Sequence, residues 1–577
     1  MMVFPKRVLS KINYKKLVRQ RLPITTWLPQ YTFSTFVQDL IAGLTVAMVE
    51  IPQGIAYAAI AGLPPQYGLF SGLADGFIYA ILGGCKDINV GPGSLLSLLI
   101  QSSVLQAGPQ AAILLTFLSG VIVLALGIMQ LGFLINFFSY PVITGFINSG
   151  VIQIFLGQVI NILGLTSKSN GVIDNCSTIV NQIYETRKWD TILGVTSLVA
   201  LLVLKGVGVF GTLHDRPDWS KRRNLLGKFI FGLYLARSAI ILVIGTSIAY
   251  YFREDPPFKT AGQVADSFPT LQAPSFSTTF NGTYYSFGDL LSVFNITLMF
   301  IPLISILEEL TLSKTFSKGK RIDGTQEMIA IGFCNLVGSF VGSMPVTGSF
   351  SRSTINHASG VKTTMGGVFT SLVLLLAIAF LTSAFRFVPK ATLAAILISA
   401  LMSLFELKAM ILFWKFKKLD LLVFSVTFVI GLFFGTDYGI LVGACFNCLF
   451  VLYANARPKF TVTKEVDCGS DVYVVTPRHT LYFPAAEYLR DKVVEFEGDN
   501  VTVVINGKYI RSMDITVARG VTNLTDELVM KNRKVVLWNF KESIKNMCIG
   551  VNKNMEDHFF SDEDYKTVLR DESIVIA

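Results

Sequence analysis

The chain has 577 residues and a formal net charge of +10, with 52% hydrophobic but only 15% charged residues. Soluble globular domains average about 25% charged residues, so the composition excludes a soluble enzyme, a secreted disulfide scaffold and a disordered chain. Residues 88–167 contain no Asp, Glu, Lys, Arg or His. Because about 20 apolar residues cross a bilayer, that stretch alone predicts three or more crossings. We therefore predict an α-helical polytopic membrane protein whose surroundings are the lipid bilayer.

The first segment, residues 1–30, carries seven Lys and Arg residues and no acid. This composition predicts a basic cytoplasmic N-terminal arm. The first apolar stretch begins only at Phe33, which argues against a signal peptide.

Apolar segments then fill residues 31–456, the predicted transmembrane domain. We expect fourteen spans, over 39–60, 66–84, 92–106, 111–130, 132–162, 190–205, 229–251, 289–312, 326–342, 349–358, 365–385, 390–405, 420–435 and 438–454. With the N-terminus inside, the inside loops hold sixteen Lys and Arg residues and the outside loops hold seven. This asymmetry predicts that both termini are cytoplasmic. The sequons at Asn175 and Asn281 fall in the two longest outside loops and are candidate glycosylation sites.

Residues 457–577 have a different composition, with an ordinary balance of acids and bases. Strands are predicted over 471–477, 501–505 and 534–538, and helical periodicity over 484–496 and 515–531. Strands that alternate with helices predict a small cytoplasmic α/β domain.

An internal repeat organises the transmembrane domain. Pro52 in the first span recurs as Pro302 in the eighth, and glycine-containing stretches (Gly91-Pro-Gly-Ser; Thr347-Gly-Ser) open the two short spans, 92–106 and 349–358. A seven-span unit that occurs twice must repeat upside down, which predicts a seven-plus-seven inverted repeat. Two short, interrupted segments at corresponding positions indicate a transporter site near the middle of the membrane.

The two short spans have the chemistry of an anion site. A half-helix that starts inside the bilayer leaves its first N–H groups unpaired and carries roughly +0.5 charge at that end. In an inverted repeat the two N-termini can face each other and hold an anion with no metal or cofactor. Gly91 and Gly93 allow close backbone approach. Four hydroxyls can add donors, those of Ser94, Ser349, Ser351 and Ser353.

Arg352 lies in the first turn of the second short span. An arginine within the bilayer needs a partner, and a permeating anion would serve. The alternative is that Arg352 binds a backbone carbonyl or a carboxylate and only fixes its helix. Gln53 and Tyr57 share one face after Pro52 and either line this site or pack.

Carboxylates deep in spans are candidates for carrying protons. Glu308 is the proton-coupling candidate, with Glu309 beside it and Glu50 at a nearly repeat-related position. The alternative for each is charge neutralisation of Arg352 or Arg237. Asp75 is interpreted as a structural residue or as part of the pathway lining, and His357 as a hydrogen-bonded structural residue, with a proton relay as the alternative.

These residues carry a resemblance to a known family. Ile51-Pro-Gln-Gly-Ile-Ala-Tyr-Ala and Ala61-Gly-Leu-Pro-Pro-Gln-Tyr-Gly-Leu-Phe-Ser resemble the signature of the sulfate permease (SulP) family of anion transporters. Gly91-Pro92, Pro345-Val-Thr-Gly-Ser-Phe-Ser-Arg-Ser-Thr and the C-terminal α/β region fit as well. Within the family, the chain is most similar to the sodium-independent sulfate anion transporter branch.

The resemblance implies fourteen spans in core and gate domains, homodimers, elevator-type movement and a C-terminal STAS domain. By position it implies anion contacts from seven residues, Gln53, Tyr57, Gly93, Ser94, Ser349, Ser351 and Arg352, and a proton-linked role for Glu308. Asp514-Ile-Thr516 lies where related domains carry a phosphorylatable loop, although Asp514 is first of all a helix cap.

The resulting prediction is a sulfate transporter, with exchange for chloride, bicarbonate or oxalate, or coupling to protons, left open. An anion channel or voltage-responsive membrane motor is the alternative, and a nucleobase or borate permease is a further one. The plasma membrane is the expected location, with lysosomal or other endomembranes as the alternative. No catalytic residues, metal or cofactor are predicted, because the sequence has no Gly-rich phosphate loop, metal cluster or nucleophile–base pair. No nucleic-acid partner is predicted, because the basic residues gather in the arm and the inside loops.

Overall fold

The computed structural model describes residues 19–131, 138–165, 172–211, 221–252, 257–261, 268–316, 323–402, 404–467, 470–478, 481–495, 501–531 and 533–560. Most of the predicted basic arm, residues 1–18, lies outside the described residues. Internal contacts divide the chain into two units, Met1–Ala444 and Cys445–Ala577. The division falls inside the helix α20, Thr436–Ala456, whereas the sequence places the domain boundary after residue 456.

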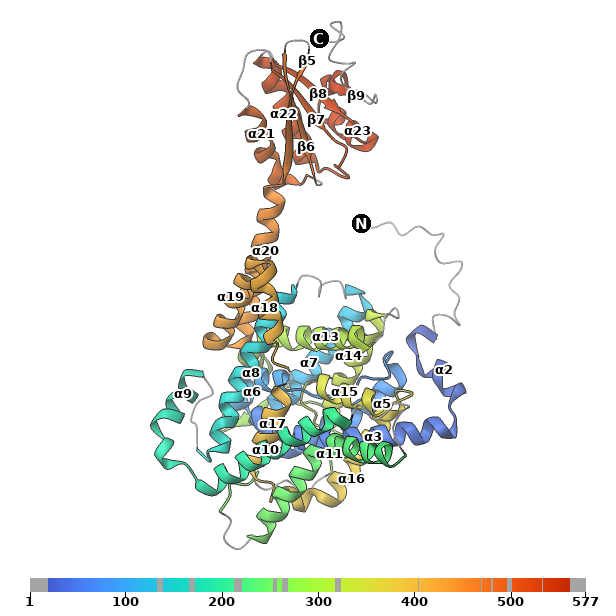
Figure 1. The fold of residues 1–577 in the computed structure, drawn as a ribbon, viewed down its shortest axis with the longest axis vertical. Coiled ribbons are helices and arrows are strands. Elements are labelled where there is room, and N and C mark those ends of the chain that lie inside the picture. The colour runs from blue at the N-terminus through green and yellow to red at the C-terminus, as the bar shows by residue number, and fades with distance from the viewer. Residues whose placement is uncertain are drawn as a thin grey trace. The chain divides into compact units, whose positions relative to one another are not determined.

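The first unit is a bundle of helices (Figure 1). Its first half comprises α2 Ile24–Trp27, α3 Phe33–Ile60, α4 Pro65–Phe70, α5 Leu73–Leu82, β1 Val90–Pro92, α6 Ser94–Ala107, α7 Pro109–Ile128, α8 Tyr140–Ile162, α9 Val172–Asn181, α10 Lys188–Gly211 and α11 Lys221–Tyr251. Its second half comprises β2 Thr278–Phe280, β3 Thr283–Tyr285, α12 Phe287–Phe294, α13 Thr297–Phe316, α14 Gly324–Phe340, β4 Val346–Gly348, α15 Phe350–Ala358, α16 Met365–Phe385, α17 Lys390–Leu401, α18 Leu407–Phe416 and α19 Lys418–Phe434.

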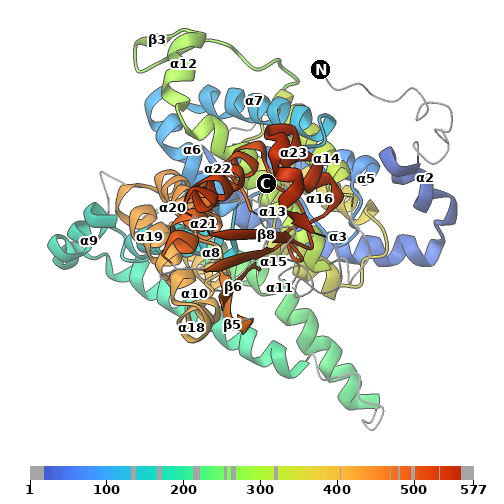
Figure 2. The ribbon, with the colours of Figure 1, turned by 90° about the horizontal axis from the view of Figure 1, so that it is seen from above.

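Several contacts between a helix of the first half and one of the second have a matching contact with the halves swapped, if α3, α5, α6 and α7 correspond to α13, α14, α15 and α16. α7 packs on α14, and α16 packs on α5. Likewise α3 packs on α16, and α13 packs on α7. In the same way α3 contacts α15 while α13 contacts α6, and α8 contacts α19 while α10 contacts α17. Figure 1 and Figure 2 both place α13, α14 and α7 side by side. Such reciprocal contacts are expected of two halves related by a twofold axis, as an inverted repeat requires.

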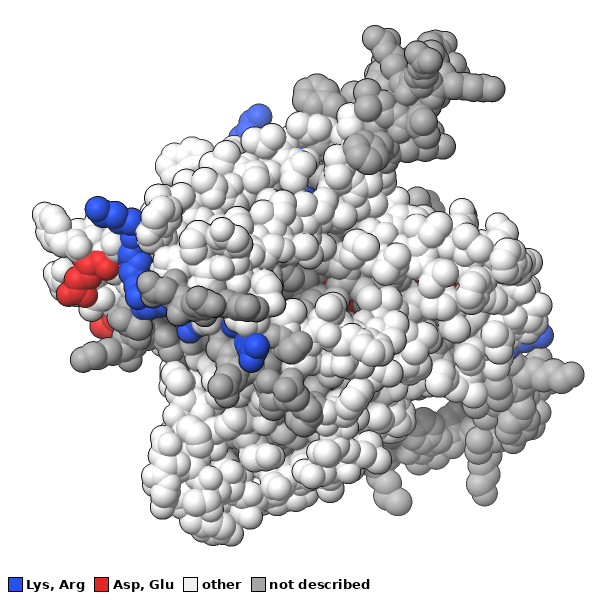
Figure 3. Space-filling model, turned by 90° about the horizontal axis from the view of Figure 1, so that it is seen from below, with Lys and Arg blue, Asp and Glu red and all other residues white. Residues whose placement is uncertain are grey.

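The helices have the length and composition of membrane spans. In the described part of the chain, seven helices can cross a bilayer, or eight if the bent pair α12 and α13, which meet at 59°, forms one span. Two shorter apolar helices, α6 and α17, add to these. Figure 3 shows one face on which nearly all described side chains are uncharged, with a few charged ones at an edge. The chain is a helical membrane protein, and the count of fourteen spans stays a prediction.

Two helices lie where the sequence analysis expects loops. The first is α9, in an expected outside loop, and the second is α18, in an expected inside loop rich in lysine. α18 buries Ala409 and Phe413, four residues apart, against Phe424 of α19. Its lysines and its other apolar side chains lie on the remaining faces, so the charge pattern hid an amphipathic helix.

The second unit contains a five-stranded sheet in the order β5-β6-β7-β8-β9. The strands are β5 Phe460–Asp467, β6 Ser470–Pro477, β7 Thr502–Asn506, β8 Lys534–Trp538 and β9 Phe559–Phe560. β5 pairs antiparallel with β6, and all other pairs are parallel. The parallel strands are connected by α21 Ala486–Val494, α22 Ile515–Met530 and α23 Glu542–Val551. The predicted α/β pattern is present, with β5, α23 and β9 added to the predicted elements.

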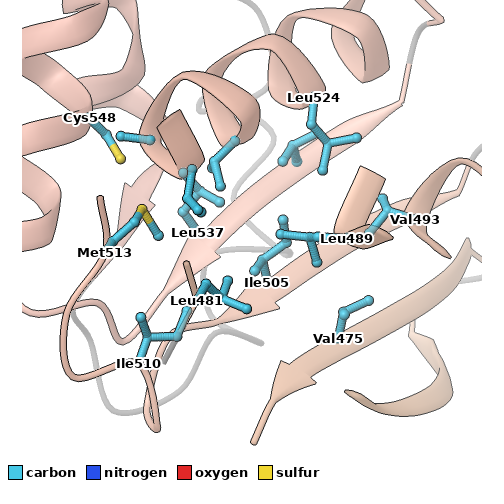
Figure 4. Close-up of a cluster of buried hydrophobic side chains, with 14 of the residues drawn as sticks. Val475, Leu481, Leu489, Val493, Ile505, Ile510, Met513, Leu524, Leu537 and Cys548 are labelled. Carbon is cyan, nitrogen blue, oxygen red and sulfur yellow. The ribbon is translucent and has the colours of Figure 1, made fainter. Parts of the chain in front are cut away.

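The core of this unit lies between the sheet and its three helices (Figure 4). Leu489 of α21, Leu524 of α22 and Cys548 of α23 pack over Ile505 and Leu537 of the central strands. All three helices therefore cover one sheet face, where alternate strand residues point. The Cys548 thiol, which is buried here, has its pKa raised to about 11 by loss of solvation, so it stays a neutral core residue.

Asp514 caps α22 and anchors a neighbouring turn. Its Oδ1 accepts from the Val517 N–H at 2.8 Å and its Oδ2 from the Phe483 N–H at 2.6 Å. We expect Asp514→Ala to lower the unfolding free energy of this unit by about 1–2 kcal/mol, because both donors lose their acceptor. Chemical denaturation measures this in a full chain whose other four tryptophans are replaced with phenylalanine, so that the fluorescence comes from Trp538. Asp526→Ala, an exposed change within α22, is the matched control, and equal losses in the two variants would contradict the capping role.

Candidate functional site

A short β-ribbon brings the two half-helices together. β1 and β4 pair antiparallel, with Gly91 opposite Thr347. α6 begins two residues after β1, and α15 begins two residues after β4. Since antiparallel strands run in opposite directions, the two helices leave the ribbon at opposite ends, with their N-termini turned toward it. The sequence prediction that two distant short spans meet is the arrangement that the structure shows.

The N-termini of both half-helices are open. Gly93 is the N-cap of α6 and Ser349 the N-cap of α15, and neither helix has a side-chain cap in the described structure. The first N–H groups of each helix therefore keep their partial positive charge and their hydrogen-bonding capacity. Two such ends beside one ribbon make a cradle that suits an anion.

Arg352 lies at the centre of this cradle and is fully buried. Its Nε donates to Asn89 Oδ1 at 2.6 Å, and its Nη1 donates to the Pro92 carbonyl at 2.9 Å. The Glu50 carboxylate approaches Nε at 4.0 Å. The guanidinium thus ties α15 to β1 and α3, which is the structural role considered from sequence. Its Nη2, however, has no hydrogen-bond partner among the described residues, so one charged donor is left for a ligand.

The wall opposite the ribbon comes from α3. Gln53 Nε2 donates to Ser351 Oγ at 3.3 Å, and Ser351 Oγ lies 3.5 Å from Ser349 Oγ. Tyr57, one turn further along α3, is buried and interacts electrostatically with Arg352. Pro52 lies inside α3, where a proline removes one helical hydrogen bond. The structure therefore brings Gln53, Tyr57 and the α15 serines to one place.

The remaining predicted contacts line the α6 side. Ser94 is the first residue of α6, and a Cβ built on Gly93 would lie 3.9 Å from Glu308 Oε2. Glu308 of α13 thus faces the cradle, whereas its neighbour Glu309 turns behind β4, where its Oε2 accepts from the Gly348 N–H at 3.0 Å. Asn89 was not predicted; its only sequence signal is that it lies two residues before Gly91, in front of the first short span.

Gly91 is held between two charged groups. A Cβ built there would lie 2.5 Å from Glu50 Oε1 and 2.9 Å from Arg352 Nη2, closer than packed atoms tolerate. We expect Gly91→Ala to push these two side chains apart and to lower anion uptake at least about tenfold. Gly157→Ala in α8 is the matched control, because a Cβ built there would meet no atom within 4 Å. Uptake by reconstituted protein measures both, and equal activity in the two variants would contradict the contact.

Three further candidate residues make no hydrogen bond or ion pair with the cradle residues in the described structure, although Asp75 interacts electrostatically with Glu50 and Arg352. His357 Nδ1 is 2.8 Å from Asp87 Oδ1, which fits the structural role predicted for it. Asp75 is buried on α5, and neither of its carboxylate oxygens has a hydrogen-bond partner among the described residues. Arg237 donates to the Tyr234 carbonyl at 2.7 Å and stacks on the Tyr234 ring. No group of three or more metal-ligating side chains occurs in the described part of the chain.

A polytopic bundle with two half-helices that meet at their N-termini has the architecture of a secondary transporter. Residues 36–427 match the sulfate permease family. The sodium-independent sulfate anion transporter of Bos taurus is 35% identical over 564 residues, which are 96% of this chain and 91% of that protein. The chain therefore belongs to the sulfate permease family of anion transporters, and it is not an enzyme.

Other known proteins agree with this assignment. Sulfate permease 1 of Saccharomyces cerevisiae is 34% identical over 472 residues, 77% of this chain and 54% of that longer protein. The structure of the murine solute carrier 26 family member A9 anion transporter in the inward-facing state is 23% identical, with a TM-score of 0.83 over 98% of this chain and 96% of that chain. The transmembrane domain of a cyanobacterial bicarbonate transporter, BicA, has a TM-score of 0.56 at 20% identity over 72% of this chain and 98% of that one. These structures share the fold.

Proposed function

We propose that this protein is a secondary-active transporter that carries sulfate in the cradle between α6 and α15. The observation that carries the proposal is the buried Arg352 guanidinium, whose Nη2 has no hydrogen-bond partner among the described residues and lies beside Gly91 in the ribbon that joins the two uncapped half-helices. A tetrahedral dianion offers acceptors in several directions at once, so one ion can meet donors from both helices and from Arg352. The names of the bovine and yeast relatives specify sulfate, which supports the same substrate here.

Protons are the proposed coupling ion. Glu308 Oε2 faces the same cradle, and an ionised carboxylate there would repel a sulfate dianion. A protonated Glu308 removes that repulsion, so an anion and a proton would occupy the site together. Exchange for chloride, bicarbonate or oxalate is the alternative mode, in which the returning anion replaces the proton.

The cradle also favours a charged substrate over a nucleobase. A neutral base would leave the positive charge of Arg352 with carboxylates as its only opposing groups in the described structure, and the one that forms an ion pair with it, Glu50, is 4.0 Å away. Buried charges need a close partner, and an anion supplies one. Competition of sulfate binding by uracil and by borate tests this choice.

The proposed movement is elevator-type alternating access. The bundle of α3, α5, α7, α13, α14 and α16 holds the cradle, and α8, α10, α17 and α19 pack with one another as a second bundle. Rigid-body displacement of one bundle against the other would expose the cradle alternately to the two sides. We propose a homodimer formed through the membrane and C-terminal domains, with the latter acting as a STAS domain.

The proposed location is the plasma membrane, or an endomembrane such as the lysosome, with both termini cytoplasmic. We expect the Asn281 sequon to carry a glycan, because Asn281 is exposed in the turn between β2 and β3. Asn175, the sequon in the other expected outside loop, is only 4% exposed on α9, so it should be modified poorly. Endoglycosidase treatment should shift the gel mobility of the wild type and of Asn175→Gln but not of Asn281→Gln. A shift that persists without Asn281 would contradict this topology.

The direct test of function is radiolabelled sulfate flux into proteoliposomes of the purified chain. Three conditions separate the coupling modes: no gradient, an inward proton gradient, and internal chloride. We expect uptake above that of empty liposomes and acceleration by one of the two gradients. Absence of sulfate uptake in all three would overturn the proposal, and currents that follow the Nernst potential without coupled flux would establish the channel alternative instead.

A further inference from the structure

Behind the cradle, two buried glutamates face each other without a cation. Glu309 of α13 is 0% exposed and Glu327 of α14 is 1% exposed. Neither carboxylate takes part in an ion pair among the described residues. Two ionised carboxylates in contact inside a protein repel each other strongly, and such pairs hold one proton between them.

The hydrogen bonds around the pair favour a proton on Glu309. Glu327 accepts from the Tyr79 hydroxyl at 2.8 Å and from the Gly84 N–H at 3.1 Å. Glu309 Oε2 accepts from the Gly348 N–H, while its Oε1 has no donor in the described structure. The two carboxyls interact with each other and both interact with Tyr79, and their helices α13 and α14 pack together. A proton on Glu309 that is donated to Glu327 gives the unpartnered oxygen its hydrogen bond.

Other charged groups nearby do not neutralise the pair. The titratable side chains that interact with it are neutral or acidic: Tyr79 of α5, Cys85, Asp323, which caps α14, and Cys334 of α14. The nearby bases are engaged elsewhere. Lys86 donates to the Val361 carbonyl at 2.7 Å, Arg21 pairs with Asp323 at 3.7 Å, and His357 pairs with Asp87.

The pair has a route to water. Glu327 forms part of the wall of a cavity of about 1020 Å³ that Lys86, Asp323 and His357 also line. These residues lie in the loops that the charge pattern assigns to the cytoplasm. In the other direction, Glu309 binds the N–H of Gly348, the residue before Ser349, the N-cap of α15. The pair therefore connects an aqueous cavity to the strand that positions the cradle.

We propose that Glu309 and Glu327 form a proton-binding site, distinct from Glu308, that is loaded from this cavity and controls anion affinity in the cradle. With one proton the pair carries one negative charge, and without it two, held beside the N-terminus that must bind the anion. Loss of the proton therefore weakens anion binding, and by linkage a bound anion retains the proton. The effect on anions rests on the proposed function, whereas the shared proton does not.

The first test detects the proton without any substrate. Infrared difference spectra of the purified protein across a pH titration report protonated buried carboxyls. We expect one band to be lost in Glu309→Gln and the same band to be lost in Glu327→Gln. Asp75→Asn, a change to another fully buried carboxyl, is the control and should leave that band in place. If both glutamine variants keep all wild-type bands, or if only Asp75→Asn removes one, the proton site does not exist.

The second test measures sulfate affinity at equal pH on both sides, in a Glu308→Gln background that removes the cradle carboxyl. In this background the dissociation constant for sulfate should rise several-fold as the pH increases through the range in which the infrared band is lost. Adding Glu309→Gln or Glu327→Gln should flatten that dependence, and adding both should do no more than either alone. If the two double variants and the triple variant all keep the pH dependence of Glu308→Gln, the pair does not set the affinity for the anion. Absence of sulfate binding throughout would instead refute the proposed function, with the infrared result still standing.

Discussion

Replacement of Arg352 with alanine is expected to lower sulfate uptake by about 100-fold or more while the protein still reaches the membrane. The change removes the unpartnered Nη2 donor and the positive charge opposite Glu50, and a charge-assisted interaction in a buried site is worth about 3 kcal/mol or more. Radiolabelled uptake, normalised to surface expression, measures the loss. Arg352→Lys keeps the charge but cannot reach Asn89 and Pro92 together, so its loss should be smaller yet clear.

Two controls separate an anion contact from a merely structural role of Arg352. Arg237→Ala changes another arginine within a membrane helix, one whose guanidinium is bound to Tyr234, and it should keep most of the activity. Glu50→Gln combined with Arg352→Ala removes the carboxylate that the single variant leaves uncompensated. If this double variant recovers uptake, Arg352 acts by neutralising Glu50 and the anion contact is refuted.

Replacement of Glu308 with glutamine is expected to abolish the acceleration of sulfate uptake by an inward proton gradient. The glutamine amide resembles the protonated carboxyl in shape and charge, so sulfate should still enter from a neutral medium. It cannot release a proton, so acidifying the outside should no longer raise the rate. Initial rates measured at several external pH values, with internal pH fixed, give the result.

The controls for Glu308 come from the other buried carboxyls. Asp39→Asn changes a buried carboxyl of α3 that accepts from the Lys362 and Thr363 N–H groups, and this variant should retain the wild-type response to the gradient. Glu308→Asp keeps an ionisable group one methylene shorter and should retain a reduced response. If the uptake rate of Glu308→Gln depends on external pH as in the wild type, Glu308 does not couple protons to transport. Anion exchange is then the favoured mode.

Much of the site was predictable because its signals are local in the chain. Gly91, Gly93 and Arg352 stand at the starts of two short spans, where glycine and charge interrupt long apolar runs. The partners of Arg352 were not predictable, because Asn89 lies 263 residues away and its contact exists only through the β1–β4 pairing. Glu308 and Glu309 show the same limit. They are adjacent in sequence, yet one faces the cradle and the other faces Glu327, since helical neighbours point about 100° apart.

From the sequence alone, the scarcity and placement of charge identified the class of protein, the apolar segments and the two short spans at which a functional site was predicted. These are properties of hydropathy along the chain, and the bilayer imposes them on each segment separately. The tertiary structure decided which charges meet. Only the pairing of β1 with β4 brings Arg352 to Asn89, and only the packing of α15 on α3 brings it beside Glu50. In the same way, only the packing of α13 on α14 brings Glu309 to Glu327. Buried ionisable groups owe their chemistry to their neighbours, and in this chain those neighbours come from distant segments.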